Sequence, residues 1–197
     1  MADRQTLEVY ARRTGDYAAR AFAPGEHKAL DAFLDRLAPG ARVLDLGCGT
    51  GEASARMADR GYRPDPVDAS PEMVRHAVDA WGLPARVMTF DALDADAAYD
   101  AVWASFSLLH ATRGDFPGHL RAIRRALVPA GLFYLGMKLG TGAARDRLGR
   151  FYTYYTQDEL AELVRAAGFR VLHDRTGKGT GLDGSGFAWC QLTAQAA

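Results

Sequence analysis

The feature that most constrains this chain is a short apolar strand that runs into a glycine-rich turn. Residues 42–46 have the pattern of a buried strand, and Gly47, Gly49 and Gly51 follow directly before a helical pattern that begins at Glu52. Glycine adds no Cβ and tolerates positive φ, so a ligand can lie against bare backbone in such a turn. The amides at the start of the following helix can hold a negatively charged group. The segment therefore predicts a ligand-binding loop at the end of a strand.

The spacing of the glycines separates two classes of nucleotide-containing ligand. A dinucleotide-binding loop has the pattern G-x-G-x-x-G, and when that pattern starts at Gly47 its third glycine falls on Glu52. The loop instead has the pattern D-x-G-x-G-x-G, which starts at Asp45. A nicotinamide-dependent dehydrogenase is therefore disfavoured.

Segments with strand and helix patterns alternate along the rest of the chain. Strands are expected at 42–46, up to position 68, and at 86–90, 101–106, 132–137, 169–173 and 187–192, with helices at 1–24, 27–37, 52–60, 71–81, 116–127 and 160–167. Strands that alternate with helices predict a parallel sheet covered on both faces. The last two strands have no helix between them and are expected to be antiparallel. The predicted fold class is α/β, with a doubly wound and mostly parallel sheet.

Two prolines complicate the second strand. Pro64 and Pro66 lie in the approach to Asp68, and proline is disfavoured in a central strand because it lacks a backbone N–H. Since the prolines are two residues apart, their missing donors face the same neighbouring strand. We expect a short or frayed strand that pairs normally only near Val67.

Acidic residues follow the second and third strands. Asp68 ends the second strand, and Asp91 and Ala92 follow the third. Ligands in open α/β sheets bind beyond the carboxyl ends of the strands, so these residues are expected to lie beside the glycine loop. A carboxylate at Asp68 can accept both hydroxyl hydrogens of a ribose. The Asp91 carboxylate can accept the exocyclic amine of an adenine, while the Ala92 amide donates to a ring nitrogen.

The glycine loop, the segment Asp68-Ala69-Ser70-Pro71-Glu72-Met73 and Asp91 together resemble class I S-adenosylmethionine-dependent methyltransferases. The resemblance covers residues 40–140 best and is strongest to small bacterial enzymes that act on small molecules. It implies a Rossmann-like, seven-stranded sheet of order 3-2-1-4-5-7-6 whose last strand is antiparallel. It also implies S-adenosyl-L-methionine as methyl donor and S-adenosyl-L-homocysteine as product.

The resemblance assigns roles to individual residues. It places Asp45, Gly47, Cys48 and Gly49 around the methionine part of the cofactor, Asp68 at the ribose, Ala69 and Met73 along the adenine, Asp91 and Ala92 at the adenine edge, and Ala104 near the methyl group. The N-terminal helices of this family often close over the cofactor, which implies that Tyr17 lies against the cofactor and Tyr10 against the acceptor. We expect one domain over residues 1–197, with a helical cap segment at 1–40 and a Rossmann-like core at 41–197.

Candidate acceptor residues follow the fourth and fifth strands. Methyl transfer is an in-line displacement at an activated sulfonium, so alignment of the reactants contributes much of the rate. His110 is the candidate general base, because an unperturbed histidine titrates at about pH 6.5. Lys138 and Arg150 are expected to attract an acidic group, and Tyr154, within the aromatic segment 150–155, to wall the acceptor pocket.

Each assignment has a structural alternative. The glycines alone could form a tight turn, Asp91 could cap a loop, and Cys48 is a small loop residue rather than a nucleophile. His110 could be hydrogen-bonded at the start of a helix. The tyrosines of the N-terminal helix and the aromatic residues at 150–155 could simply pack against their neighbours.

Composition and charge disfavour other partners. Lys plus Arg and Asp plus Glu both number 24, so bulk charge gives no reason to expect nucleic acid or an anionic membrane. The two cysteines, Cys48 and Cys190, do not suggest a disulfide framework and favour a reducing cytoplasm. The N-terminus lacks an apolar signal core, and no run reaches the ~20 apolar residues of a membrane span. No cluster has metal-ligand spacing, so no metal is expected.

Nucleic-acid methyltransferases are also disfavoured. Amino-directed DNA enzymes have Asn/Asp-Pro-Pro-Tyr/Phe after the fourth strand, where this chain has Ala-Ser-Phe-Ser at 104–107, and no cysteine follows a proline as the cytosine-C5 enzymes require. We expect S-adenosylmethionine-dependent methyl transfer to a small molecule. The alternative is a non-catalytic cofactor-binding or partner-binding module on the same fold. Neither the acceptor atom nor the oligomeric state has a signal in the sequence.

Overall fold

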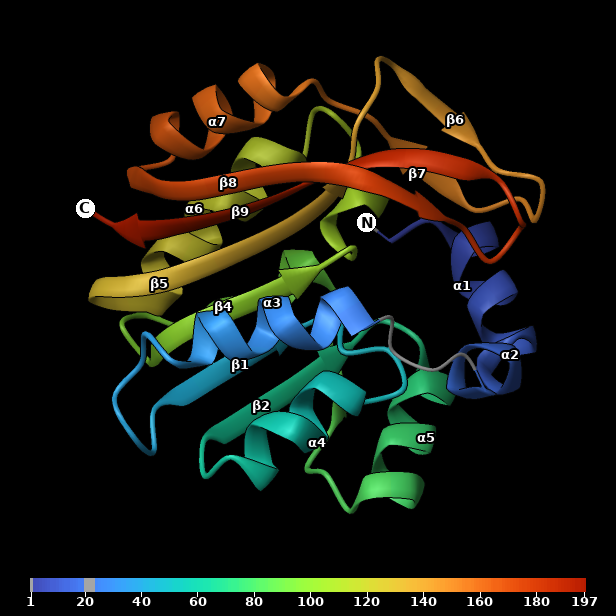
Figure 1. The fold of residues 1–197 in the computed structure, drawn as a ribbon. Helices are drawn as coiled ribbons and strands as arrows, with labels where there is room; N and C mark the ends of the chain where they lie inside the picture. The colour runs from blue at the N-terminus through green and yellow to red at the C-terminus, as the bar shows by residue number, and fades with distance from the viewer. Residues whose placement is uncertain (1, 20–23) are drawn as a thin grey trace.

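A mixed β-sheet organises the computed structural model, which describes residues 2–19 and 24–197 (Figure 1). In sheet order, its strands are β3 (Arg86–Val87), β2 (Arg63–Asp68), β1 (Arg42–Leu46), β4 (Tyr99–Ser105), β5 (Leu127–Lys138), β9 (Gly186–Ala196) and β8 (Phe169–Thr180). Neighbouring strands are parallel, except that β9 is antiparallel to both β5 and β8. The expected strand order and antiparallel last strand are confirmed, with β8 and β9 as the predicted sixth and seventh strands.

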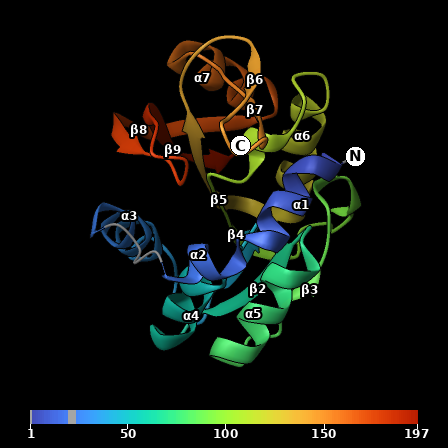
Figure 2. The same cartoon turned by 90° about the vertical axis from the view of Figure 1, so that its right-hand side faces the viewer.

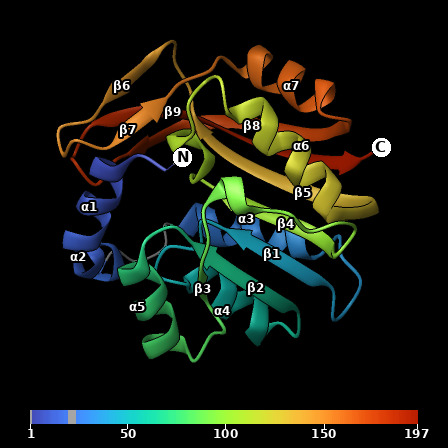
Figure 3. The same cartoon turned by 180° about the vertical axis from the view of Figure 1, so that it is seen from behind.

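Helices cover both faces of this sheet (Figure 1, Figure 3). On one face lie α3 (Pro24–Leu34) and α4 (Glu52–Asp59), and on the other lie α6 (Phe116–Ala126) and α7 (Gln157–Ala166). The remaining core helix, α5 (Pro71–Trp81), packs beside β2 and β3. This is the doubly wound arrangement that the alternating pattern predicts.

A buried apolar core lies on each face of the sheet. On the α3 side, Phe33 packs against Trp103 with ring centroids 5.5 Å apart, and Trp103 stacks on Tyr134 at 3.7 Å. On the opposite side, Phe116 of α6 and Leu160 of α7 are fully buried against the sheet. Burial of each such side chain stabilises the fold by about 1.5–3 kcal/mol. These two cores hold the strand ends in fixed positions.

The second strand differs from its prediction. β2 pairs with β1 along residues 63–67, so on that side it is neither short nor frayed. The amide of Arg63 donates to the carbonyl of Ala41 beside β1, and alternation therefore turns Pro64 and Pro66 toward β3. Because β3 pairs only with the last two residues of β2, the prolines face a side where no strand requires their missing donors.

The largest departure from the prediction is a hairpin that the sequence did not indicate. Its strands are β6 (Ala143–Arg145) and β7 (Phe151–Thr153), which form a separate antiparallel pair between β5 and α7. The third strand is also shorter than the expected range 86–90, because β3 ends at Val87 and a short 3-10 helix, η1 (Phe90–Ala92), begins at Phe90. β5, β8 and β9 all extend beyond their predicted ranges.

The N-terminal cap consists of two helices. α1 (Arg4–Arg12) and α2 (Thr14–Ala19) replace the single helix expected over 1–24, of which residues 1 and 20–23 lie outside the described part. Figure 2 shows both helices lying across the edge where the parallel strands end. α3 was expected to belong to the cap, but it packs on the sheet instead. Among helices of the described residues, none combines the length and apolarity that a membrane crossing requires.

Candidate functional site

A cavity of about 310 Å³ lies at the carboxyl ends of the parallel strands. Residues of α1 and α2 line this cavity, and Figure 2 shows these two helices across the ends of the parallel strands. The predicted site residues that line it are Tyr10, Tyr17, Asp45, Gly47, Cys48, Gly49, Asp68, Ala69, Met73, Asp91, His110, Lys138 and Arg150. Ala92, Ala104 and Tyr154 do not line it. The structure therefore places most of the predicted donor and acceptor residues on one continuous wall.

The glycine loop is held by backbone hydrogen bonds and by a close approach to Ser107 that leaves no room for a side chain at Gly47. The amides of Gly47 and Cys48 both donate to the carbonyl of Val67, at 2.8 and 2.9 Å. A Cβ on Gly47 would lie 2.3 Å from the Cβ of Ser107, and the φ of +85° is itself unfavourable for other residues. Ser107 in turn donates to the carbonyl of Leu46 at 2.6 Å. The loop is thus held between β2 and the end of β4.

Asp68 joins this loop to the start of α5. Its Oδ2 accepts from the Gly49 amide at 2.9 Å, and its Oδ1 accepts from the Ser70 amide at 2.8 Å. Burial raises the pKa of Asp68, while hydrogen bonds from these two amides oppose that rise. A Cβ built on Gly49 would meet no atom within 4 Å, so the loop faces open space beside the carboxylate.

Asp45 and Cys48 lie deeper in the wall. Asp45 is buried, and its Oδ2 accepts from the hydroxyl of Ser54 on α4 at 2.7 Å. Burial raises the pKa of Asp45 to about 7. Burial also raises the pKa of the Cys48 thiol, so the thiol stays protonated at neutral pH. This supports the structural interpretation of Cys48 rather than a nucleophilic one.

Two residues predicted to contact the cofactor, Ala92 and Ala104, do not face the cavity. Ala92 is exposed, and its amide donates to the carbonyl of Thr89 at 3.1 Å within the turn of η1 rather than toward the cavity. Ala104 is fully buried in the core under α6 and α7. Because side chains alternate along a strand, Ser105 lines the cavity in its place. The Asp91 carboxylate does line the cavity, with its Oδ1 3.9 Å from Nε2 of His119.

Both ring nitrogens of His110 have hydrogen-bond partners. His110 ends a short 3-10 helix, η2 (Leu108–His110), where Nδ1 lies 2.6 Å from the Phe151 carbonyl and Nε2 lies 2.6 Å from Oη of Tyr10. A carbonyl only accepts, so Nδ1 carries the proton and Nε2 accepts from Tyr10. Burial, together with the charges of Arg150 and Lys138, lowers the pKa of His110 to about 4. This geometry does not support the predicted role of His110 as a base.

Arg150 is a buried cation beside the cavity. It is 2% exposed, and its Nε and Nη2 donate to Oδ2 of Asp146 at 2.8 and 2.5 Å. Its Nη1 donates to Oη of Tyr17. The guanidinium also lies over the rings of Tyr10 and Tyr152, at 5.7 and 5.4 Å from their centroids. Arg150 therefore fixes the tyrosines of α1, α2 and β7 around one charge.

Lys138 lies at the end of β5 among aromatic rings. Its Nζ is 4.0 Å from the ring centroid of Tyr152 and 4.4 Å from that of Phe187. Both rings line the cavity, whereas the predicted Tyr154 does not. Tyr154 follows the end of β7 and stacks beside Tyr152, with ring centroids 6.2 Å apart, without lining the cavity itself.

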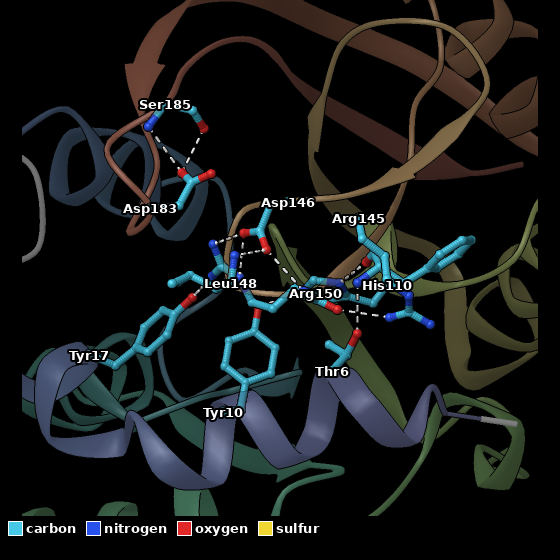
Figure 4. Close-up of polar contacts among 12 residues, drawn as sticks. Thr6, Tyr10, Tyr17, His110, Arg145, Asp146, Leu148, Arg150, Asp183 and Ser185 are labelled. Atoms are coloured by element: carbon cyan, nitrogen blue, oxygen red, sulfur yellow. Dashed lines mark hydrogen bonds and ion pairs between the residues drawn. The ribbon is translucent and has the colours of Figure 1, made fainter.

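The sequence reasoning missed the contacts that attach α1 to the β6–β7 hairpin (Figure 4). Thr6 accepts a hydrogen bond from the Phe151 amide at 2.8 Å, and Asp3 pairs with Arg145 through two bonds of 2.9 Å. These partners are more than 140 positions apart, and no local pattern marks them. They set the position of Tyr10 above the cavity.

A second missed residue is Phe106, directly after β4. Its φ of +54° is rare for a residue with a side chain, and its amide donates to the Gly136 carbonyl at 2.9 Å. Its ring lies edge-on to that of Phe187, with centroids 6.1 Å apart. Such backbone strain concentrates at functional sites, and here it turns an aromatic ring into the cavity wall.

The cavity fits the cofactor that the sequence resemblance implies. Open space beside Gly49 admits a ligand to bare backbone, and the carboxylates of Asp68 and Asp91 supply acceptors for hydroxyl and amine hydrogens. Cations and aromatic rings lie at the opposite end of the same cavity. Among the described residues, no three His, Cys, Asp or Glu side chains converge in a metal-binding group.

Comparisons with known proteins agree with this geometry. Residues 17–174 match a methyltransferase domain family. The chain is 36% identical to a ubiquinone biosynthesis O-methyltransferase of Methylocella silvestris, over 53% of this chain and 42% of that protein. It is 33% identical to a malonyl-(acyl-carrier protein) O-methyltransferase of Erwinia pyrifoliae, over 72% of this chain and 57% of that protein. The chain thus spans about half the length of the curated relatives it matches.

Solved structures show the same fold. The 1,6-didemethyltoxoflavin-N1-methyltransferase of Burkholderia thailandensis, whose structure contains S-adenosylhomocysteine, superposes with a TM-score of 0.77. The match covers 98% of this chain and 88% of that chain, at 24% identity. Together with the family match, it shows that the chain belongs to the methyltransferase domain family and has the fold of the class I S-adenosylmethionine-dependent methyltransferases.

Proposed function

We propose that this protein transfers a methyl group from S-adenosyl-L-methionine to a small-molecule acceptor by in-line displacement. One observation carries the proposal. A single cavity joins the glycine loop and Asp68 to a second group of residues, which includes Tyr10, Lys138 and Arg150. A module that only bound the cofactor would have no need for a second, chemically distinct end to its cavity.

The end of the cavity formed by the glycine loop, Asp68 and Asp91 is the donor end, which binds and orients the cofactor. Asp68 is placed to accept the hydroxyl hydrogens of a ribose while its backbone contacts hold the loop in shape. Asp91 is placed to accept from an adenine amine, and Met73 supplies an apolar surface. When bound, the cofactor supplies a methyl group on a positively charged sulfur, which is already activated for transfer.

The acceptor end aligns the second reactant and excludes water. Tyr10 and Tyr17 from the N-terminal helices approach Tyr152 from the hairpin, and Arg150 lies among all three rings. Fixing two reactants in line converts a bimolecular step into an effectively unimolecular one. Because both ring nitrogens of His110 are engaged, we assign His110 to holding Tyr10 in place rather than to removing a proton.

The relatives support a small acceptor. The names of two curated relatives describe O-methyl transfer, in ubiquinone biosynthesis and to malonyl-(acyl-carrier protein), and a third relative is named as a dimethylglycine N-methyltransferase. The O-methyltransferase names favour an oxygen acceptor.

Calorimetric titration with S-adenosylhomocysteine, with NADH in parallel, tests the proposal. We expect saturable binding of S-adenosylhomocysteine with a micromolar dissociation constant, and no comparable binding of NADH. Absence of binding at concentrations of about 500 μM, equivalent to a free energy weaker than about −4.5 kcal/mol, would overturn it. Binding without methyl transfer to any compound of a broad metabolite panel would favour the non-catalytic module.

A further inference from the structure

Most of the charged side chains that line the cavity are divided between its two ends. Asp45 lies in β1, Asp68 ends β2 and Asp91 follows β3, all in one half of the sheet. The other carboxylates of the lining are Glu52, Asp115 and Asp3, the last of which is paired with Arg145. Lys138 ends β5 in the other half, and Arg150 precedes β7 beside it. A ligand that spans the cavity therefore meets carboxylates at the donor end and cations at the acceptor end.

Two carboxylates that interact with these cations lie behind the cavity wall. Asp146 is buried against Arg150. Burial raises the pKa of Asp183, but the hydrogen bonds from Ser185 and the charge of Lys138 lower it, and the net shift is downward. Neither Asp146 nor Asp183 lines the cavity. Figure 4 shows Asp146 beside the guanidinium and Asp183 turned toward Ser185. Lys138 and Arg150 therefore supply positive charge at this end of the cavity lining.

Aromatic faces surround the ammonium group of Lys138. The rings of Tyr152 and Phe187 lie on it, and Phe106 packs edge-on against Phe187. Lys138 is 8% exposed. Ring faces attract a cation but solvate it less well than water, so an anion that reaches Lys138 gains a strong interaction in a poorly solvated place.

Three side chains at the acceptor end are poorly suited to removing a proton from an acceptor. His110 has both ring nitrogens engaged, and burial and two nearby cations lower its pKa. Burial raises the pKa of Tyr10 and of Tyr152, so both phenols stay protonated. An acceptor that must lose a proton would therefore receive little help from these three side chains at neutral pH.

We infer that the acceptor enters as an oxygen anion, a carboxylate or an already ionised acidic hydroxyl on a flat apolar body, with Lys138 as its counter-charge. The inference rests on the proposed methyl transfer and names the substrate class of the same cavity. The anionic oxygen forms the new O–CH₃ bond with its own electron pair as the S–CH₃ bond breaks, so a neutral methyl ester or ether and a neutral thioether result. No proton is released, and no base is required.

Paired probes of the same shape test the charge preference. Benzoate and benzamide are titrated into the protein by calorimetry, with and without saturating S-adenosylhomocysteine. We expect benzoate to bind at least about tenfold more tightly than benzamide, a difference of about 1.4 kcal/mol. Equal affinities, or no binding of either probe at about 50 mM, overturn the inference. The selectivity between the two probes is also measured in the absence of S-adenosylhomocysteine. Failure of S-adenosylhomocysteine itself to bind would therefore refute the proposed function and not the charge preference.

Variants of Lys138 assign the preference to one residue. Lys138→Met keeps an apolar side chain of similar length, and this variant should bind benzoate and benzamide with about equal affinity. Lys138→Arg should retain most of the preference for benzoate. Lys178→Met, at an exposed position of β8, is the matched control and should leave the preference unchanged. Unfolding transitions of all three variants show whether the fold is retained. A preference that survives in a folded Lys138→Met protein overturns the assignment.

Discussion

The phenol of Tyr10 lies 2.6 Å from Nε2 of His110, across 100 residues of sequence. This contact links the N-terminal helix α1 to the end of β4 through the cavity. Since Nδ1 of His110 donates to the Phe151 carbonyl, the imidazole must stay neutral to accept from Tyr10. The position of α1 and the ionisation state of His110 are therefore coupled.

We expect His110 to remain neutral down to about pH 4, as measured by NMR titration of its ring resonances. The folded pKa lies below that of an unfolded histidine, so His110 contributes stability that is present at pH 7 and lost as the pH falls from about 6.5 to about 4. Tyr10→Phe removes the donor that favours the neutral ring and should raise the pKa. A wild-type midpoint near 6.5 would contradict the burial of the ring and the hydrogen bond that Nε2 accepts from Tyr10.

Substitution by alanine should affect stability and cofactor binding differently at Gly47 and at Gly49. Gly47→Ala and Gly49→Ala both place alanine at positive φ, which costs about 1–2 kcal/mol. Only at Gly47 does the new Cβ meet Ser107, at 2.3 Å, so Gly47→Ala should destabilise the protein further in urea unfolding. Gly49→Ala should reduce S-adenosylhomocysteine affinity more than stability. Equal losses of stability would mean that the loop relaxes around the Gly47 clash.

The parallel half of the fold could be predicted because its signals are local. The predicted bounds of β1 and of α5 match the structure, and Ser70 caps α5 by accepting from the Met73 amide as a serine before a proline suggests. The glycine spacing located the donor end of the cavity for the same reason. The loop, the strand end and the helix start are consecutive in sequence.

The acceptor end could not be predicted because it depends on contacts between distant segments. The β6–β7 hairpin has strands of three residues, too short to show periodicity. Arg150 was expected to attract an acidic group and does line the cavity, but its burial against Asp146 and its contact with Tyr17 had no signal in the sequence. Ala104 was predicted to contact the cofactor, but side-chain alternation along β4 places it in the core, and its neighbour Ser105 lines the cavity. The sequence alone assigns strand residues to one face or the other only when the strand boundary is known to the exact residue.

Asp68→Ala should weaken S-adenosylhomocysteine binding by about ten- to a hundredfold, equivalent to hydrogen bonds to a charged group worth about 1.5–3 kcal/mol. The change also leaves the amides of Gly49 and Ser70 without their acceptor, so stability should fall as well. Calorimetric titration well below the unfolding midpoint measures the affinity, and a thermal unfolding transition without ligand measures the stability, so the two effects are separated. Asp79→Ala, at an exposed position of α5, is the control and should alter neither quantity. Unchanged affinity in Asp68→Ala would refute the ribose assignment.

The pair between Asp3 and Arg145 should control how often α1 leaves the cavity. Both side chains are partly exposed, so Arg145→Gln should cost less than about 1 kcal/mol of global stability. Hydrogen exchange of the α1 amides should nevertheless accelerate, and S-adenosylhomocysteine should dissociate faster, because α1 residues line the cavity.

Matched variants separate the ion pair from the helix cap. Asp3 also accepts from the Thr6 amide at 2.8 Å as the N-cap of α1. Asp3→Asn should keep that cap and lose the ion pair, and so should resemble Arg145→Gln, whereas Asp3→Ala should show faster exchange than either. Arg4→Gln removes an exposed pair with Glu8 within the same helix and should leave the dissociation rate unchanged. If Arg4→Gln and Arg145→Gln accelerate dissociation equally, α1 is held by its own helical stability and not by its contact with the hairpin.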